Sequence, residues 1–297
     1  MKIPKTARGL RTWVEIDTRA LKKNAGEIKR FLGKKTLLMG VVKSNAYGHG
    51  LVPVARALES AGSDWLGVDS VVEALCLRKE GIRAPILVLG YTLPEHFGKA
   101  SKEKISLTVS RLTTLDAARK WTEKNKKPLR IHLKLDTGMH RQGFLPEEMP
   151  ALKEALQKIF QQRHAHILQN VSMSLLKVEG MYSHLAGANP KVPESANAQV
   201  KTFQRCMREL RKVVPASAKG SGGTMPKPLT HIAASGGLLM FPRVFDMARS
   251  GIMLYGLWPS PEARAYGEKK LKLTPVLSWK TLVSEIKHIP RGEKIGY

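Results

Sequence analysis

Strand-like and helix-like segments alternate along most of this 297-residue chain, and this alternation predicts an α/β protein with a parallel sheet. About eight β/α units follow one another, and the chain is long enough to form one large domain. The apolar fraction of 42% is ordinary for a soluble protein. Together these observations predict a (β/α)8 TIM-type barrel with active groups on the loops that follow the strands.

Apolar spacing predicts the elements of the first half. The segment 21–32 carries apolar or small residues at helical intervals, and Asp17 or Thr18 can cap its first turn. A strand that ends at Lys43 follows. The further elements predicted here are helix 52–60, strand 65–68, helix 71–79, strand 85–89, strand 105–109 and helix 112–123.

The second half continues the alternation but contains two polar stretches. Its predicted elements are strands 129–135, 178–184 and 229–233, helices 147–160 and 196–213, and a last unit at 245–255. The stretch 161–176 contains His164 and His166, which have no partner cluster, so a solvated loop is favoured over a metal site. The stretch 215–228 contains Ser-Gly-Gly-Thr without the lysine of a phosphate loop, which favours a connector.

The net charge is unusual, because 50 basic and 24 acidic residues give +26. Such a surplus attracts anions and promotes weak, salt-sensitive adhesion to nucleic acid. The cations are scattered, however, and short runs such as 124–127 and 269–272 contain no interleaved stacking aromatics. The charge therefore indicates a dispersed basic surface and no specific nucleic-acid partner.

The sequence lacks the features that are typical of secreted and membrane-spanning proteins. The basic N-terminus is not followed by the apolar core of a signal peptide, and no apolar run approaches the roughly 18–20 residues of a spanning helix. Cys76 and Cys206 lie far apart, outside any metal or redox spacing. We therefore expect a cytoplasmic protein with no metal site and no membrane partner.

The most informative segment is 41–50, Val-Val-Lys-Ser-Asn-Ala-Tyr-Gly-His-Gly. It places Lys43 at the end of an apolar run and directly before a small-residue, glycine-rich turn that contains Tyr47. A buried strand tolerates an ammonium group poorly unless the charge is paired or given up. At a strand's carboxyl end, a lysine can lose its proton and form a Schiff base with an aldehyde cofactor such as pyridoxal phosphate (PLP). The alternative, a solvated loop lysine, is disfavoured by the longer context.

The segment 41–50 closely resembles the PLP-lysine signature of bacterial alanine racemases, which are fold-type III PLP enzymes. Further blocks resemble the same family in the same order, namely 12–17, 85–90, 132–139, 179–184 and 248–257. The chain is identified as a member that lacks most of the family's C-terminal β-domain. The resemblance implies a PLP-binding barrel over residues 1–270 and only the first strand or strands of that β-domain in 271–297.

The resemblance implies PLP as the cofactor and assigns residues to it. Lys43 would carry the cofactor as a Schiff base and act as one catalytic base. Tyr47, Ser235 and the backbone at Gly251 and Ile252 would bind the cofactor phosphate, and hydroxyl and N–H groups suit that dianion.

The resemblance also implies the roles of five residues around the ring and the substrate. Arg249 would face the pyridine nitrogen and, as a permanent cation, keep it neutral. Arg141 would contact the substrate carboxylate, and a planar guanidinium fits that group in bidentate fashion. Lys134, often carbamylated in the family, would position this arginine. His184 would hydrogen-bond the second catalytic base, whose counterpart is Tyr297, a residue that acts across the dimer interface in the family.

The resemblance thus implies an isomerase that interconverts L- and D-alanine with Lys43 and Tyr297 as opposed bases. It would supply D-alanine for peptidoglycan in the cell wall, and it would form a homodimer when the C-terminal domain is present. The alternative is a non-catalytic or inactive PLP-binding protein, which the missing part of the β-domain would favour. The presence of Arg141, His184 and Tyr297 favours the racemase.

Overall fold

The computed structural model describes residues 8–161, 175–214 and 227–296. Its main sheet contains eight parallel strands in the order β8-β7-β6-β5-β4-β3-β2-β9. These strands are β2 (Leu37–Val41), β3 (Trp65–Val68), β4 (Ile86–Val88), β5 (Ser106–Val109), β6 (Leu129–Lys134), β7 (Leu176–Tyr182), β8 (Leu229–His231) and β9 (Met247–Ser250).

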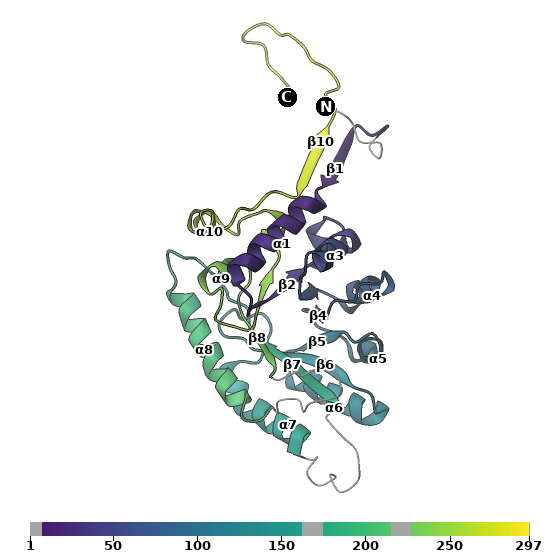
Figure 1. The fold of residues 1–297 in the computed structure, drawn as a ribbon, viewed down its shortest axis with the longest axis vertical. Coiled ribbons are helices and arrows are strands. Elements are labelled where there is room, and N and C mark those ends of the chain that lie inside the picture. Colours follow the sequence, from purple (N-terminus) through teal and green to yellow (C-terminus); the bar gives the residue numbers. More distant parts are fainter. Residues whose placement is uncertain (1–7, 162–174, 215–226, 297) are drawn as a thin grey trace.

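The sheet curves until its two edge strands meet. The backbone N–H of Arg249 in β9 donates to the carbonyl of Ala233, just after β8, at 2.9 Å. The backbone N–H of Thr230 in β8 donates to the carboxylate of Asp246, just before β9, at 2.8 Å. The predicted (β/α)8 barrel is therefore confirmed, as a nearly closed barrel (Figure 1).

Helices connect the strands and lie along the outside of the barrel (Figure 1). The α-helices are α1 (Thr18–Leu32), α3 (Leu51–Ser60), α4 (Val71–Lys79), α5 (Phe97–Lys102), α6 (Leu112–Asn125), α7 (Met149–Gln161), α8 (Glu194–Leu210), α9 (Ser235–Met240) and α10 (Pro261–Gly267). The short segment α2 (Lys43–Tyr47) is a left-handed turn at the carboxyl edge. The short 3-10 helices are Pro94–His96, Pro146–Glu148 and Ile252–Tyr255. The predicted cap of the first helix is confirmed, because the Asp17 side chain accepts the backbone N–H groups of Arg19 and Ala20.

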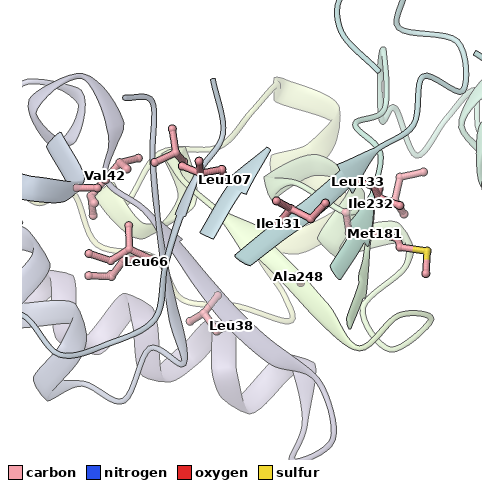
Figure 2. Packing of buried hydrophobic residues seen from close by; sticks show 14 of the residues in the cluster. Leu38, Val42, Leu66, Leu107, Ile131, Leu133, Met181, Ile232 and Ala248 are labelled. Carbon is pink, nitrogen blue, oxygen red and sulfur yellow. The ribbon is translucent and has the colours of Figure 1, made fainter. Parts of the chain in front are cut away.

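Side chains alternate between the two faces of each strand, and the two faces carry different layers. The outer layer packs between sheet and helices and includes Leu38, Leu66 and Ile131 (Figure 2). The inner face carries a separate apolar cluster of Met39, Trp65, Leu87, Tyr182 and Met247. Buried polar side chains share this inner face, among them Lys134, His132, His231 and Arg249. The interior therefore supplies a polar floor beneath the carboxyl edge of the barrel.

A second, two-stranded sheet lies apart from the barrel wall. Strand β1 (Thr12–Ile16) pairs antiparallel with β10 (Leu277–Thr281), so that Thr12 faces Thr281 and Ile16 faces Leu277. This sheet lies beyond the end from which α1 starts (Figure 1). The strands were not expected from apolar spacing, and the domain boundary at residue 270 stays a prediction.

The structure confirms most predicted elements and corrects the bounds of some. Strand 65–68 and helix 71–79 have the predicted bounds, whereas the strand predicted at 178–184 covers Leu176–Tyr182, which leaves His184 in the following loop. Most of the two polar stretches, including His164, His166 and the Ser-Gly-Gly-Thr segment, lies outside the described residues. Within the described ranges no helix could span a bilayer, and no three histidine, cysteine or acidic side chains are grouped to hold a metal ion.

Candidate active site

Lys43 lies at the carboxyl edge of the barrel, as the sequence predicts, but the strand predicted to end at this residue ends at Val41, so Lys43 begins the following segment. The four residues after it, Ser44 to Tyr47, all have φ angles of 54–55°, which form a left-handed turn without a single glycine. Such a conformation costs roughly 1–2 kcal/mol per non-glycine residue. It persists only where the surrounding structure determines it, and such strain is concentrated at functional sites.

Glu73 of α4 holds this left-handed turn in place. One carboxylate oxygen of Glu73 accepts the backbone N–H of Asn45 at 3.1 Å, and the other accepts that of Asp69 at 2.8 Å. The Asn45 side chain in turn accepts the backbone N–H of Leu51 at 2.8 Å. The Asp69 carboxylate lies 3.9 Å from the Lys43 ammonium. The loops after β2 and β3 are therefore joined through one carboxylate, and Lys43 lies between them.

An anion cradle lies at the carboxyl ends of β2, β8 and β9, made by Tyr47, Ser235 and Gly251. Ser235 Oγ accepts the backbone N–H of Gly251 at 3.3 Å. A Cβ atom built on Gly251 would lie 2.6 Å from Tyr47 Oη, so only glycine lets this hydroxyl approach the backbone. Burial raises the pKa of Tyr47, which keeps its proton available for donation. Ile252 begins the 3-10 helix directly after the cradle, so the four predicted phosphate residues are brought together.

Arg249 lies on the polar floor of the barrel and is 2% exposed. Its Nη2 donates to the carbonyls of Ser183 (2.7 Å) and Ile232 (3.0 Å) and contacts Nδ1 of His184 at 3.1 Å. Its Nη1 contacts Nδ1 of His231 at 2.6 Å. Burial lowers the pKa of Arg249 to about 10, which leaves the guanidinium charged at neutral pH.

The contacts of Arg249 fix the proton positions of its histidine neighbours. A guanidinium only donates, so His184 and His231 must each present the lone pair of Nδ1 and carry a proton on Nε2. The Nε2–H of His231 then donates to Nδ1 of His132 at 3.0 Å. Burial, followed by the charge of Arg249, lowers the pKa of both His132 and His184 to about 3. His184 is therefore a neutral imidazole that offers an Nε2–H donor.

The loop after β6 presents Arg141 beside Lys134. The Asp136 carboxylate shapes this loop by accepting the backbone N–H of Arg141 and of the three residues before it, each at 3.0 Å. Lys134 is 5% exposed, and its Nζ donates to the side chain of Gln142 at 3.1 Å. Burial, followed by the charges of Arg141 and Arg249, lowers the pKa of Lys134 to about 8. Lys134 thus has a larger neutral fraction than a surface lysine.

Several residues that shape the site have no role that could be assigned from the sequence. Glu73 stands three residues after Ser70, which is the spacing of a capping box and indicates a side chain that turns back to the helix start, but its carboxylate accepts the N–H groups of Asp69 and Asn45. His231 carries no such signal, because one histidine in an apolar strand is typical of a core. Tyr182 stacks on His231 with ring centroids 4.6 Å apart, and burial raises its pKa to about 12.

Tyr297, the predicted second base, lies outside the described residues. Its position relative to Lys43 and His184 therefore stays a prediction. The other predicted site residues lie at the carboxyl edge of the barrel or on its polar floor.

The fold and the site define a class of protein: a (β/α)8 barrel in which a lysine at the carboxyl edge accompanies an anion cradle and a buried arginine. Residues 16–259 match the family model described as alanine racemase, N-terminal domain. The chain belongs to this family.

Individual relatives agree with this assignment. The alanine racemase of Methanococcus maripaludis is 36% identical over 286 residues, which cover 96% of this chain and 70% of the relative. The solved alanine racemase of Bacillus anthracis is 34% identical with a TM-score of 0.77, covering 97% of this chain and 68% of that one. The Streptomyces coelicolor alanine racemase has a TM-score of 0.82 at 28% identity, covering 99% and 72%.

Proposed function

We propose that this chain racemises alanine with PLP as cofactor and with Lys43 and Tyr297 as opposed bases. The observation that carries the proposal is the gathering of Lys43, the anion cradle and Arg249 at one edge of the barrel, in a chain whose relatives are named alanine racemases.

The residues present fit PLP. The cradle offers the hydroxyls of Tyr47 and Ser235 for a phosphate, the Gly251 N–H holds the Ser235 oxygen, and any side chain at Gly251 would fill the cradle. Lys43 supplies the amine to which the cofactor aldehyde would bind, and Arg249 would face the ring nitrogen. Once bound, the cofactor would accept the electron pair that the α-carbon keeps when its proton leaves.

The two bases would work on opposite faces of the substrate. Lys43 Nζ would remove or return the α-proton on one face, and Tyr297 Oη would do so on the other. The neutral tautomer of His184 would donate its Nε2–H to the oxygen of Tyr297 and stabilise the anionic form of that tyrosine. The two bases would exchange roles between the two directions of the reaction.

Arg141 and Lys134 would fix the substrate carboxylate. The guanidinium of Arg141 can bind a carboxylate through two parallel hydrogen bonds. The lowered pKa of Lys134 favours a neutral amine, which is the form that reacts with carbon dioxide to give a carbamate. We propose that the carbamate, once formed, pairs with Arg141 and holds its side chain in the binding orientation.

The cellular role follows from the reaction. The enzyme would supply D-alanine to peptidoglycan synthesis in the cytoplasm. It would act as a homodimer in which each subunit donates Tyr297 to its partner.

The test is α-proton exchange in D2O with added PLP, followed separately from L- and D-alanine. Exchange and inversion from both enantiomers are expected. Tyr297→Phe should retain PLP binding but lose inversion by at least about a hundredfold, because one face then lacks its base. Tyr266→Phe in α10, which changes an exposed tyrosine, is the matched control and should behave as wild type.

Other outcomes would contradict the proposal in distinct ways. An unchanged rate in Tyr297→Phe would exclude the two-base assignment. PLP bound through Lys43 without exchange from either enantiomer would identify a non-catalytic PLP-binding protein. Lys43→Ala should abolish covalent PLP under either reading, so it serves only as the control for cofactor attachment.

A further inference from the structure

The amino edge of the barrel, opposite the site, gathers cations that are scattered in the sequence. Because the strands are parallel, the loops that enter them all lie at one edge. The loops before β4, β5 and β6 are neighbours, since these strands are adjacent in the sheet. Figure 1 shows α4, α5 and α6, from which these loops leave, side by side along one flank. We call their exposed cations the lysine crescent: Lys79, Arg83, Lys102, Lys104, Lys124, Lys126 and Lys127.

Hydrogen bonds join the three loops into one platform. Arg78, at the end of α4, donates from Nε to the carbonyl of Glu103 in the next loop at 3.0 Å. It also donates from Nη1 to the carbonyls of Ile82 and Ala84 at 2.8 and 2.9 Å. Ser101 donates to the carbonyl of Pro128 in the third loop at 2.7 Å. The crescent therefore presents its charges on a connected backbone.

Three nearby carboxylates are bound elsewhere, whereas that of Glu103, between Lys102 and Lys104, forms no ion pair among the described residues. Glu80 pairs with Arg56 of α3 at 2.9 Å, and Glu123 pairs with Arg119 within α6 at 2.7 Å. Glu59 accepts the backbone N–H groups of residues 83 and 84. Among the described residues, no member of the crescent forms an ion pair. The cations are thus free to meet an outside anion.

Two members of the crescent occupy positions where the backbone favours glycine. The ends of α3, α4 and α5 share one motif, in which a left-handed residue follows the helix and the next N–H reaches back into it. That residue is Gly62 after α3 and Gly81 after α4, but Lys104 after α5, with a φ of 52°. Lys126 after α6 is also left-handed, with a φ of 53°. At this edge, lysine stands where glycine would be the less strained choice.

We propose that the lysine crescent docks the protein onto the surface of an anionic phospholipid bilayer. The three loops enter the sheet at the same edge of the barrel, so an extended array of lipid phosphates can meet all of them at once. None of the residues in 79–84, 101–105 or 124–128 is aromatic, which disfavours base stacking. The attraction is electrostatic, with no inserted side chain.

This proposal revises the expectation of a dispersed basic surface without a membrane partner. The cations are separated along the chain, and only the parallel topology brings them together. Docking by the amino edge leaves the opposite, carboxyl edge with Lys43 turned towards the solvent.

The test is co-sedimentation of the PLP-loaded full chain with phosphatidylcholine vesicles that do or do not contain phosphatidylglycerol. The variant Lys102→Gln/Lys104→Gly/Lys126→Gly/Lys127→Gln should lose at least about tenfold in affinity for the anionic vesicles. Its two glycine changes relieve left-handed strain, so thermal unfolding should show a folded protein. The control with the same charge change is Lys22→Gln/Lys23→Gln/Lys191→Gln/Lys201→Gln, which alters exposed lysines outside the crescent and should bind as wild type.

Three results would overturn the proposal. The first is wild-type binding that is equal for neutral and anionic vesicles at physiological ionic strength, or absent from both. The second is an equal loss in the crescent variant and the control, which would indicate net charge alone. The third is crescent-dependent binding to duplex RNA with no binding to anionic vesicles, which would assign the surface to nucleic acid.

Discussion

At the scale of single residues, the shape of the anion cradle depends on the missing side chain of Gly251. The Tyr47 hydroxyl occupies the space that a methyl group on Gly251 would need, and the backbone N–H of Gly251 donates to Ser235 Oγ. The cradle therefore depends on Gly251 in two ways: the missing side chain leaves room for Tyr47, and the backbone N–H holds Ser235.

We expect Gly251→Ala to weaken PLP binding by at least about tenfold. The added methyl would displace Tyr47 and remove one hydrogen bond to a charged group, which is worth about 1.5–3 kcal/mol. Fluorescence titration with PLP measures the change. Gly26→Ala in α1, where a Cβ meets no atom within 4 Å, should leave affinity unaltered. Wild-type affinity in Gly251→Ala would show that this glycine does not shape the binding site.

Lys134 should make stability depend on pH. Its pKa is about 8 in the folded protein against an ordinary 10.5, so the unfolded chain binds more protons between these values. The free energy of unfolding should therefore rise by up to about 3 kcal/mol from pH 8 to 10.5, and this gain is lost as the pH falls from 10.5 to 8. Urea unfolding across this range should show a flatter profile for Lys134→Met. The exposed Lys158→Met should retain the wild-type slope.

At the scale of elements, the left-handed turn after Lys43 depends on a helix that follows it in sequence. Glu73 of α4 supplies both acceptors that join the turn to the loop after β3. The reactive lysine is thus positioned by the packing of one β/α unit on the next.

We expect Glu73→Ala to lower the free energy of unfolding by about 1–2 kcal/mol, because two backbone donors lose their acceptor. Covalent attachment of PLP should also slow, since Lys43 loses its fixed turn. Stopped-flow absorbance and urea unfolding measure the two effects. Glu95→Ala, whose side chain is 71% exposed, is the control and should change neither. If PLP attached at the wild-type rate to a destabilised Glu73→Ala variant, the turn would not control the reactivity of Lys43.

The loop before β5 offers a change that should stabilise the protein. Lys104→Gly should raise the free energy of unfolding by about 1 kcal/mol, because glycine adopts the left-handed conformation without strain. Lys102→Gly, two residues earlier in α5, should lower it, since glycine is a poor helix former. Thermal unfolding measures both. If Lys104→Gly destabilised the protein, the side chain of Lys104 would have to stabilise the fold.

Elements whose signals are local were predictable from the sequence, and those that depend on distant partners were not. Strand 65–68 is apolar and buried along its length, so its bounds were clear. Strand β1 is half exposed, and its partner β10 lies about 265 residues away, so neither could be inferred from spacing. The site residues came from family resemblance. The tautomer of His184 could not be predicted from the sequence, because it depends on which ring nitrogen of His184 faces the guanidinium of Arg249.

At the scale of the whole molecule, apolar side chains are exposed on β10 and the segment after it. Trp279 is 78% exposed, Val283 75%, Ile286 80% and Ile295 86%. Four large apolar side chains exposed within 17 residues indicate an interaction site. These side chains lie on β10 and on the segment that continues beyond it, away from the barrel (Figure 1).

We expect the chain to self-associate through this surface, consistent with the proposed homodimer. Sedimentation velocity should show a weight-average mass that rises with concentration, and Trp279→Ser should shift this rise to higher concentrations. Val72→Ser in α4, an isolated side chain that is 68% exposed, should have no effect. A monomer at all concentrations would show that a second copy does not cover this surface.

The pairing of β1 with β10 has a consequence for synthesis on the ribosome. Strand β1 has no complete partner until residue 281 has left the exit tunnel. Strand β2 likewise waits for β9, because Leu37 pairs with Met247. Contacts of such high sequence separation form late and slowly. The nascent chain must therefore hold two unpaired strand edges for most of its translation, which makes it a natural client for chaperones that shield exposed edges.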